Sequence, residues 1–296
     1  MLDEIHVKNG WAKPVPSLYP QPQQRFTGAH WAFSEARAAL HAAGRLVSTE
    51  WAERRNLILA NPVADNEYPT VTTLVAAYQM VKAGEKARSH RHTPNAMRVV
   101  VEAGPETYTL VDGARVPMEP GDVLLTPNWS FHGHDNCSKQ DAYWIDILDA
   151  PLVQMLGPMF FEHHAEITER TERVDHESPM RFRYVDWNPL LRHQAQESAG
   201  VRLLKLGPAT LSTFDRTAIA LDNGARWECP RTTANQILVV ISGEGRSAIG
   251  EASMDWRSGD VIAAPSWQPQ VHWARTEAVL LRMSDAPVMR AFGWLR

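Results

Sequence analysis

Two His-x-His pairs carry the clearest chemistry in this sequence: His-Arg-His at 90–92 and, about forty residues later, His-Gly-His at 132–134. On a β-strand, residues i and i+2 project to the same face, so His90 and His92 can direct two imidazoles at one point. A third histidine from an adjacent strand would complete a three-nitrogen face for a divalent metal. The spacing therefore predicts a metal site.

A single His-x-His pair on its own is more often an accident of surface or core packing than a metal site. Here two pairs fall within one predicted β-domain, and each pair lies beside a glycine or proline turn. The combination favours the metal site over the accidental interpretation.

The elements around the histidines are predicted to be short strands. The chain has 296 residues, 44% of them hydrophobic, which is enough for more than one core. Short β-branched or aromatic runs, separated by glycine turns, favour antiparallel sandwiches or barrels over an alternating α/β fold. We expect strands at 72–81, 98–101, 106–111, 123–126, 143–148, 201–206, 218–221, 236–241, 247–250, 261–264 and 278–283, and helices at 34–40 (behind a Ser34 N-cap), 49–55 and 151–161.

The β-rich pattern occurs twice. Gly121, Asp122, Val123, Pro127 and Trp129 recur as the same residue types 138 residues later. Matching glycine and proline positions in register indicate two copies of one barrel. We therefore expect an all-β-dominated chain with these parts: an N-terminal arm and short helices at 1–62, a metal-binding barrel at 63–150, a mixed connector at 151–200 and a second barrel at 201–296.

Composition excludes several classes of function. Thirty Lys plus Arg against 34 Asp plus Glu give a net charge of −4, which offers no basic surface for nucleic acid or an anionic membrane. Two cysteines cannot form a disulfide framework, and no run is long and apolar enough for a membrane span. The acidic start, Met-Leu-Asp-Glu, does not resemble a secretion signal. We expect a soluble, cytoplasmic protein.

The spacing of the histidines resembles the two cupin motifs. The first is Gly84-x5-His90-x-His92-x4-Met97-x6-Gly104, with Met97 where most cupins have Glu. The second is Gly121-x5-Pro127-x-Trp129-x2-His132-x3-Asn136, with Trp129 in place of the usual Gly. The blocks at 84–98 and 126–134, with Glu-Arg-Arg at 53–55 and Asn-Pro at 61–62, resemble the gentisate 1,2-dioxygenase family of bicupins, which includes salicylate and 1-hydroxy-2-naphthoate dioxygenases.

This resemblance implies a bicupin fold, two double-stranded β-helix (jelly-roll) barrels, and roles for individual residues. It implies Fe(II) ligation by His90, His92 and His132. It implies that Arg98 and Arg54 hold the substrate carboxylate, that His134 acts as acid or base, and that Asp146 orients His134. For Arg54 the competing interpretation is an exposed helix face beside Arg55. A protein carboxylate at position 97 would block one of three open metal positions and neutralise charge that should attract the substrate.

The implied activity is an extradiol-type aromatic ring cleavage. O2 is inserted between the carboxyl-bearing and the adjacent hydroxyl-bearing carbon of a 2-hydroxybenzoate-type acid, with gentisate to maleylpyruvate the leading reaction. The alternatives are salicylate, halo- or nitrosalicylate, and 1-hydroxy-2-naphthoate. Partners would be a small aromatic carboxylic acid, O2 and further copies of the chain in a homotetramer. A different cupin enzyme or a non-enzymatic small-ligand-binding cupin remains open.

Two departures from the family pattern stand out. The second copy has Pro230, Thr232 and Gln270 where the first has His90, His92 and His132, and only His272, matching His134, is retained. We therefore expect a metal-free second barrel. Thr-Leu-Val at 73–75 stands where many relatives have Thr-Leu-Trp, so we expect a smaller side chain at that position of the pocket wall.

Overall fold

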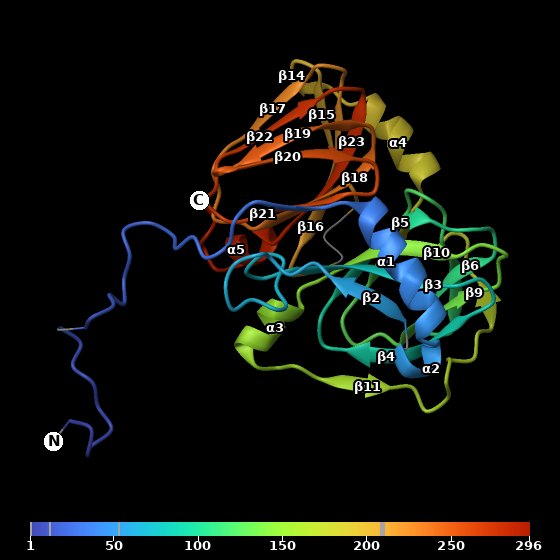
Figure 1. Cartoon of the computed structure of the whole chain (residues 1–296), viewed down its shortest axis with the longest axis horizontal. Helices are drawn as coiled ribbons and strands as arrows, with labels where there is room; N and C mark the ends of the chain where they lie inside the picture. The colour runs from blue at the N-terminus through green and yellow to red at the C-terminus, as the bar shows by residue number, and fades with distance from the viewer. Residues whose placement is uncertain (1, 12, 53, 208–210) are drawn as a thin grey trace.

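The chain folds into two β-barrels packed side by side, with an extended N-terminal arm that leads away from them (Figure 1). This computed structural model describes residues 2–11, 13–52, 54–207 and 211–296. No helix within those ranges is long and apolar enough to cross a membrane.

The first barrel consists of two six-stranded sheets, in which all pairs are antiparallel except β12 with β7. One sheet has the order β13 (Arg181–Phe182), β8 (Val123–Thr126), β5 (Ala96–Glu102), β10 (Ala142–Leu148), β3 (Val75–Val81), β2 (Arg55–Ile58). The other has the order β11 (Phe161–His163), β4 (Lys86–His92), β9 (His132–Asn136), β6 (Thr107–Val111), β7 (Ala114–Pro117), β12 (Arg173–Val174).

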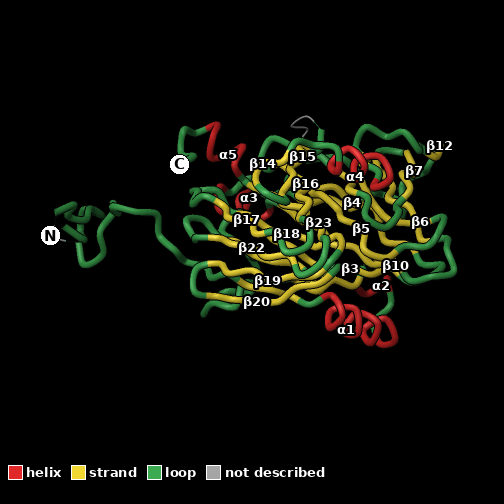
Figure 2. Tube along the Cα trace, turned by 90° about the horizontal axis from the view of Figure 1, so that it is seen from above, coloured by secondary structure: helices red, strands yellow, loops and turns green. Residues whose placement is uncertain are grey.

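The second barrel pairs a seven-stranded with a four-stranded sheet. The larger sheet has the order β1 (Ala29–Trp31), β21 (Val261–Ala264), β18 (Gln236–Ser242), β23 (Ala278–Ser284), β16 (Asp215–Leu221), β15 (Val201–Lys205), β14 (Gln196–Ser198). The smaller has β17 (Arg226–Cys229), β22 (Gln270–Ala274), β19 (Glu244–Ile249), β20 (Ala252–Arg257). The helices are α1 (Phe33–Leu46), α2 (Thr49–Ala52), α3 (Ala150–Leu156), α4 (Tyr184–Arg192) and α5 (Ala286–Ala291), and Figure 2 shows them at the margins of the strands.

The expected fold class, mostly β with two barrels and short helices, is confirmed, but two local predictions are wrong. Ser34 does not cap α1, which begins one residue earlier; the Phe33 N–H donates instead to Asp260 Oδ1 at 2.9 Å. The helix predicted over 49–55 ends at Ala52, and Arg55 already belongs to β2. In both cases a distant segment supplies the hydrogen bonds that local propensity could not anticipate.

The segment expected to connect the barrels also builds the first one. Its three short strands, β11, β12 and β13, extend both sheets of that barrel at their edges. An unpaired sheet edge exposes backbone N–H and C=O groups, so covering it is favourable. Strands of two or three residues leave no hydrophobic alternation in the sequence, and this pairing therefore had no periodic signal.

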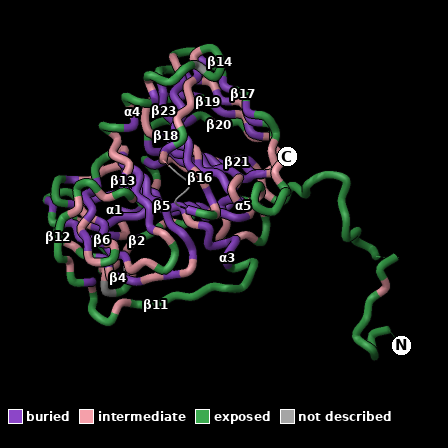
Figure 3. The backbone as a smooth tube through the Cα atoms, turned by 180° about the vertical axis from the view of Figure 1, so that it is seen from behind, coloured by how far each residue is buried: buried purple, intermediate pink, exposed green. Residues whose placement is uncertain are grey.

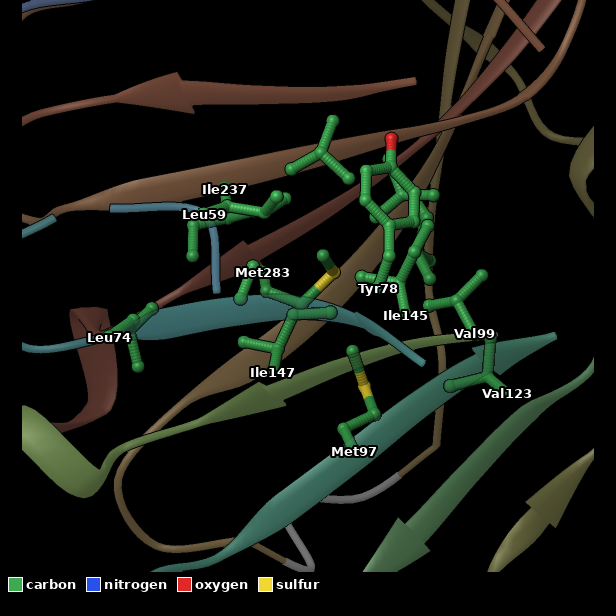
Figure 4. Close-up of a cluster of buried hydrophobic side chains, with 14 of the residues drawn as sticks. Leu59, Leu74, Tyr78, Met97, Val99, Val123, Ile145, Ile147, Ile237 and Met283 are labelled. Carbon is green, nitrogen blue, oxygen red and sulfur yellow. The ribbon is translucent and has the colours of Figure 1, made fainter. Parts of the chain in front are cut away.

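The central strands are buried on both faces (Figure 3). Alternate residues of β5 and β10, such as Met97 and Ile145, join a core between the two barrels that also contains Ile237 and Met283 of the second barrel (Figure 4). The residues between them face the barrel interior, where Val100 and Trp144 form a separate apolar cluster. Each strand thus serves two cores with its two faces.

Each barrel takes up a strand from the segment that precedes the other barrel in the sequence. β1, which precedes the first barrel in sequence, pairs with β21 of the second, where Asp260 accepts the Phe33 N–H at the start of α1. β13, which precedes the second barrel, pairs with β8 of the first, where Asp122 accepts the Tyr184 N–H at the start of α4 at 2.8 Å. Gly121 and Gly259 have φ of 85° and 88°, and a Cβ at either would come within 2.8 Å of the facing ring of Tyr184 or Phe33. These contacts explain why glycine recurs 138 residues apart in the sequence.

A second pair of matching contacts links the barrels. Asn95 donates to both oxygens of Asp149, and Thr213 of the second barrel donates to the same carboxylate. Asn235 donates to both oxygens of Asp285, which also accepts the hydroxyl of Thr73 from the first barrel. Burial raises the pKa of Asp285 to about 6, so these donors offset the cost of its ionised form.

We expect Thr73→Val to destabilise the chain by about 1–3 kcal/mol, because Asp285 loses one donor while buried. Urea unfolding followed by circular dichroism measures this loss. Thr276→Val is the matched control, since Thr276 is exposed and water can replace its hydrogen bonds. Equal stability of the two variants would contradict the role of the Thr73–Asp285 contact.

Candidate metal centre

The three predicted ligands meet inside the first barrel. β4 carries His90 and His92, and β9 carries His132, which lies in register with His90. Their ligand atoms all lie within 4.8 Å of one another, and all three side chains are buried. Among the described residues, this is the one group of three or more His, Cys, Asp or Glu side chains placed closely enough for a metal.

Backbone carbonyls orient two of the rings. His92 Nδ1 donates to the Pro94 carbonyl at 2.8 Å, and His132 Nδ1 donates to the Ser130 carbonyl at 3.0 Å. A proton held on Nδ1 leaves the Nε2 lone pair free for a metal. His132 Nε2 is buried without any protein partner, which is the expected state of an atom that binds an ion.

Burial and nearby arginines keep the triad neutral. Desolvation, with Arg54 the next cause, lowers the pKa of His90 to about 2, and desolvation lowers the pKa of His92 to about 4. The pKa of His132 lies well below its usual range, first because of desolvation and then because of the nearby charge of Arg98. Neutral imidazole is the form that ligates metals, so no proton has to leave before binding at neutral pH.

Two groups contact the His90 ring from outside the two strands of the triad. Arg54 lies at the bend after α2, and its guanidinium nitrogens are 3.2 Å from His90 Nε2 and 3.5 Å from Nδ1. Phe161 of β11 stacks on the same ring with centroids 5.1 Å apart. Arg54 is therefore half-buried beside the triad and does not lie on an exposed helix face. The neighbouring Arg55 is buried and pairs with Glu85.

Arg98 and Asp146 form a buried ion pair on the inward faces of β5 and β10. Arg98 Nε lies 3.1 Å from Asp146 Oδ1, the two residues are paired in register, and both are almost fully buried. Arg98 also donates to Thr126 Oγ1 at 2.7 Å, and Gln79 Nε2 donates to Asp146 Oδ2 at 2.7 Å. This network fixes the guanidinium inside the barrel by charge-assisted hydrogen bonds.

His134 shares the inward face of β9 with His132. Its ring packs on Trp144 with centroids 4.4 Å apart, and both ring nitrogens are buried without a protein partner. The contact by which Asp146 was expected to orient His134 is not made among the described residues; Asp146 is held by Arg98 and Gln79 instead. His134 therefore offers both nitrogens to whatever occupies the barrel.

Met97 does not face the metal site. Its side chain lies in the core between the barrels (Figure 4), and the inward-facing neighbour of Arg98 on β5 is Ala96. Met97 is therefore a core residue.

Several residues of the site are not predicted by any motif in the sequence. Gln79 is an amide within an apolar strand, which could have indicated a buried polar partner. Thr126 and Thr109 belong to short strands and bind Arg98 through their hydroxyls. Phe161 comes from the segment interpreted as a connector, and only the pairing of β11 with β4 brings it to His90.

Comparisons with known proteins agree with this geometry. Residues 77–148 match the family described as Cupin domain. The chain is 31% identical to gentisate 1,2 dioxygenase 1 of Aquipseudomonas alcaligenes, over 90% of this chain and 85% of that protein. It is 31% identical to a 1-hydroxy-2-naphthoate 1,2-dioxygenase of Nocardioides sp. (strain KP7), over 99% and 82%. It is similar to the crystal structure of salicylate 1,2-dioxygenase from Pseudoaminobacter salicylatoxidans in adducts with gentisate, with a TM-score of 0.91, 27% identity, and coverage of 100% and 91%.

We expect one tightly bound metal ion per chain, lost in His132→Ala and kept in Gln270→Ala. The second substitution changes the matching position of the other barrel, which provides no imidazole triad. Elemental analysis after dialysis measures both, and circular dichroism checks that His132→Ala is folded. Two tightly bound ions in the unsubstituted chain, or full metal content in His132→Ala, would contradict the assignment.

Proposed function

The chain belongs to the gentisate and salicylate 1,2-dioxygenase family of bicupin ring-cleaving dioxygenases, and on that premise we propose that its first barrel uses Fe(II) to cleave gentisate to maleylpyruvate. O2 enters the ring between the carboxyl-bearing carbon and its hydroxyl-bearing neighbour. Because the cleaved bond is not beside a pair of hydroxyls, we call the reaction ring cleavage rather than extradiol cleavage.

The observation that carries this proposal is a buried three-histidine face with two arginines beside it. Iron fits the donor set, because neutral imidazole is a ligand that Fe(II) accepts and His132 Nε2 is a buried nitrogen with no protein partner. Three neutral ligands leave the ion its full charge, which suits an anionic substrate. Bound Fe(II) would supply O2 activation and a Lewis acid for the substrate's carboxylate and ortho oxygens.

The chain's own side chains would bind and orient the acid. Arg54, beside His90, would hold the carboxylate in a charge-assisted bidentate contact. Arg98 would add its charge, held in position by Asp146 and Thr126. His134, with two unpaired buried nitrogens, would accept the proton of the substrate hydroxyl. Phe161 and Trp144 would help to exclude water from the ring.

The substrate's ring substituents depend on the pocket wall. Val75 lies on the same strand face as Gln79 and is in register with Leu148. A valine in place of the larger residue of many relatives leaves more room there. Salicylate, halo- or nitrosalicylate, and 1-hydroxy-2-naphthoate therefore remain alternatives to gentisate.

We also propose that the second barrel binds no metal. In this division of the chain, residues 1–62 form the N-terminal arm and helices, 63–150 the metal-binding barrel, 151–200 the connector and 201–296 the second barrel. Assembly as a homotetramer in the cytoplasm follows from the family in the same way. A second candidate function, a non-enzymatic ligand-binding cupin, has no need of three converging imidazoles and would bind its ligand equally well without metal.

The deciding experiment reconstitutes the chain anaerobically with Fe(II) and then supplies O2 with gentisate, salicylate, substituted salicylates or 1-hydroxy-2-naphthoate. We expect one O2 consumed per aromatic ring lost, measured with an oxygen electrode and ultraviolet spectra, with gentisate fastest. Ligand binding without O2 consumption for every acid would overturn the enzyme in favour of a binding protein.

We expect Arg54→Gln to raise the Michaelis constant at least tenfold with metal content unchanged, because a charge-assisted contact contributes about 1.5–3 kcal/mol. Arg54→Lys should restore only part of the loss, since an ammonium cannot contact two oxygens in a plane. Arg45→Gln, an exposed arginine in the last turn of α1, is the control. A normal Michaelis constant in Arg54→Gln would remove Arg54 from the substrate site.

Arg98 needs a different substitution, because Arg98→Ala would leave Asp146 buried without its cation, at a cost of about 3–5 kcal/mol. A lower catalytic efficiency in that variant would not separate binding from folding. Arg98→Lys keeps the charge beside Asp146, so it can be assayed as folded protein.

A further inference from the structure

We propose that the mouth of the second barrel is a metal-independent binding site for a small hydroxylated carboxylic acid. A cavity of about 680 Å³ opens there, at the position where the first barrel holds its triad, with Cys229, Pro230 and Thr232 in its wall. Pro230 and Thr232 occupy the positions that match His90 and His92. The barrel has therefore lost its metal ligands and kept its cavity.

The cavity is lined by an arginine, Arg282, that forms no ion pair with a described carboxylate. In the first barrel Arg98 and Asp146 face each other across β5 and β10, and each neutralises the other. At the corresponding pair in the second barrel, Leu238 faces Arg282 across β18 and β23. Among the described residues no carboxylate lies within ion-pair distance of Arg282, which donates to Thr217 Oγ1 at 3.3 Å and has a buried, unpartnered Nε.

The Arg282 guanidinium therefore keeps its charge without an ion-pair partner among the described residues. Arg282 is partly buried and lies over the Trp227 ring at 5.8 Å. Three carboxylates also line the cavity, those of Glu197, Asp215 and Glu228; Glu228 pairs with Arg226, and none of the three forms an ion pair with Arg282 in the described part of the chain. An uncompensated guanidinium in a concave, partly desolvated site attracts an anion that can accept two hydrogen bonds.

Unpartnered polar atoms indicate what else the ligand must carry. Gln236, 5% exposed, lines the cavity, and its Oε1 has no hydrogen-bond partner. Gln270, at the position matching His132, pairs in register with Cys229 of the wall, and its Oε1 is also buried and unpartnered. An acceptor without a donor in the cavity wall calls for a ligand with hydroxyl or amino hydrogens.

A third polar atom lies on the same strand face as Gln270. Ser247 Oγ accepts the Trp256 indole N–H at 2.8 Å and is hydrogen-bonded to His272 Nδ1 at 2.7 Å. His272 Nε2 is buried and has no hydrogen-bond partner among the described residues. Arg282 and Gln236 line the cavity itself, whereas Gln270 and His272 adjoin its wall residues Cys229 and Trp227. Arg282 would donate to the carboxylate oxygens of the ligand, and Gln236 would accept a hydrogen bond from its hydroxyl.

The walls between these polar groups include Trp227, which stacks on His272 with centroids 5.0 Å apart. A flat aromatic wall with a few polar groups is typical of small-molecule sites. The proposed ligand is accordingly a carboxylic acid with a nearby hydroxyl, and salicylate is the simplest probe. None of these residues belongs to the first barrel, so this site does not depend on ring cleavage.

The test is equilibrium dialysis of labelled salicylate against metal-free protein, in which no turnover can occur. We expect Arg282→Gln and Gln236→Leu each to lose one saturable salicylate per chain, or to bind it at least tenfold more weakly. Arg246→Gln, an exposed arginine on β19 of the same barrel, should match the unsubstituted chain. Benzoate, which lacks the hydroxyl, should compete more weakly than salicylate.

The two variants protect the test against misfolding. Circular dichroism and thermal unfolding establish that each is folded; if Arg282→Gln is not, Gln236→Leu, with a side chain of similar size, decides. Identical stoichiometry and affinity in Arg282→Gln, Gln236→Leu and the unsubstituted chain would overturn the site, as would an equal loss in Arg246→Gln. A chain without dioxygenase activity that still shows the expected losses would support this site and contradict only the proposed reaction.

Discussion

The central strands of each barrel must satisfy two cores at once, and the rest of the structure depends on that constraint. One face of β5 and β10 packs against the second barrel through residues such as Met97 and Ile145, and the other lines the first barrel's interior. A charge on an inward position is then buried without access to bulk water. Arg98 and Asp146 can occupy such positions only because they face each other, since an isolated buried charge would be far too costly.

The exchange of leading segments makes the two barrels one structural unit. α1 begins against Asp260 of the second barrel, and α4 begins against Asp122 of the first. Thr73 and Thr213 complete the buried carboxylate networks of the opposite barrels. Because each barrel supplies hydrogen bonds that the other needs, we expect the metal-binding barrel to lose stability if it is separated from the second one. The second barrel therefore supports the site through these hydrogen bonds.

Within this shared frame the two interiors have diverged. The first pairs an arginine with an aspartate beneath three imidazoles; the second places Arg282 opposite Leu238 and replaces the triad by Pro230, Thr232 and Gln270. The scaffold contacts, including the glycines at φ near 85° and the Asn–Asp networks, are the same in both. Contacts that hold the barrels together are thus repeated, and side chains inside the barrels differ, as expected when function resides in a site placed on a common fold.

The sequence by itself determined features that depend on short-range geometry. His90 and His92 share a face because strand periodicity is two, and the repeated Gly-Asp-Val and Pro-x-Trp positions follow from one turn used twice. Only the tertiary structure decided which distant groups meet. It brought Asp146 to Arg98 and Gln79, Arg54 and Phe161 to His90, Met97 to the core between the barrels, and the Phe33 N–H to Asp260. Periodicity encodes the face of a strand, whereas the partner across that face is set by strand order and register, which arise only when the whole chain folds.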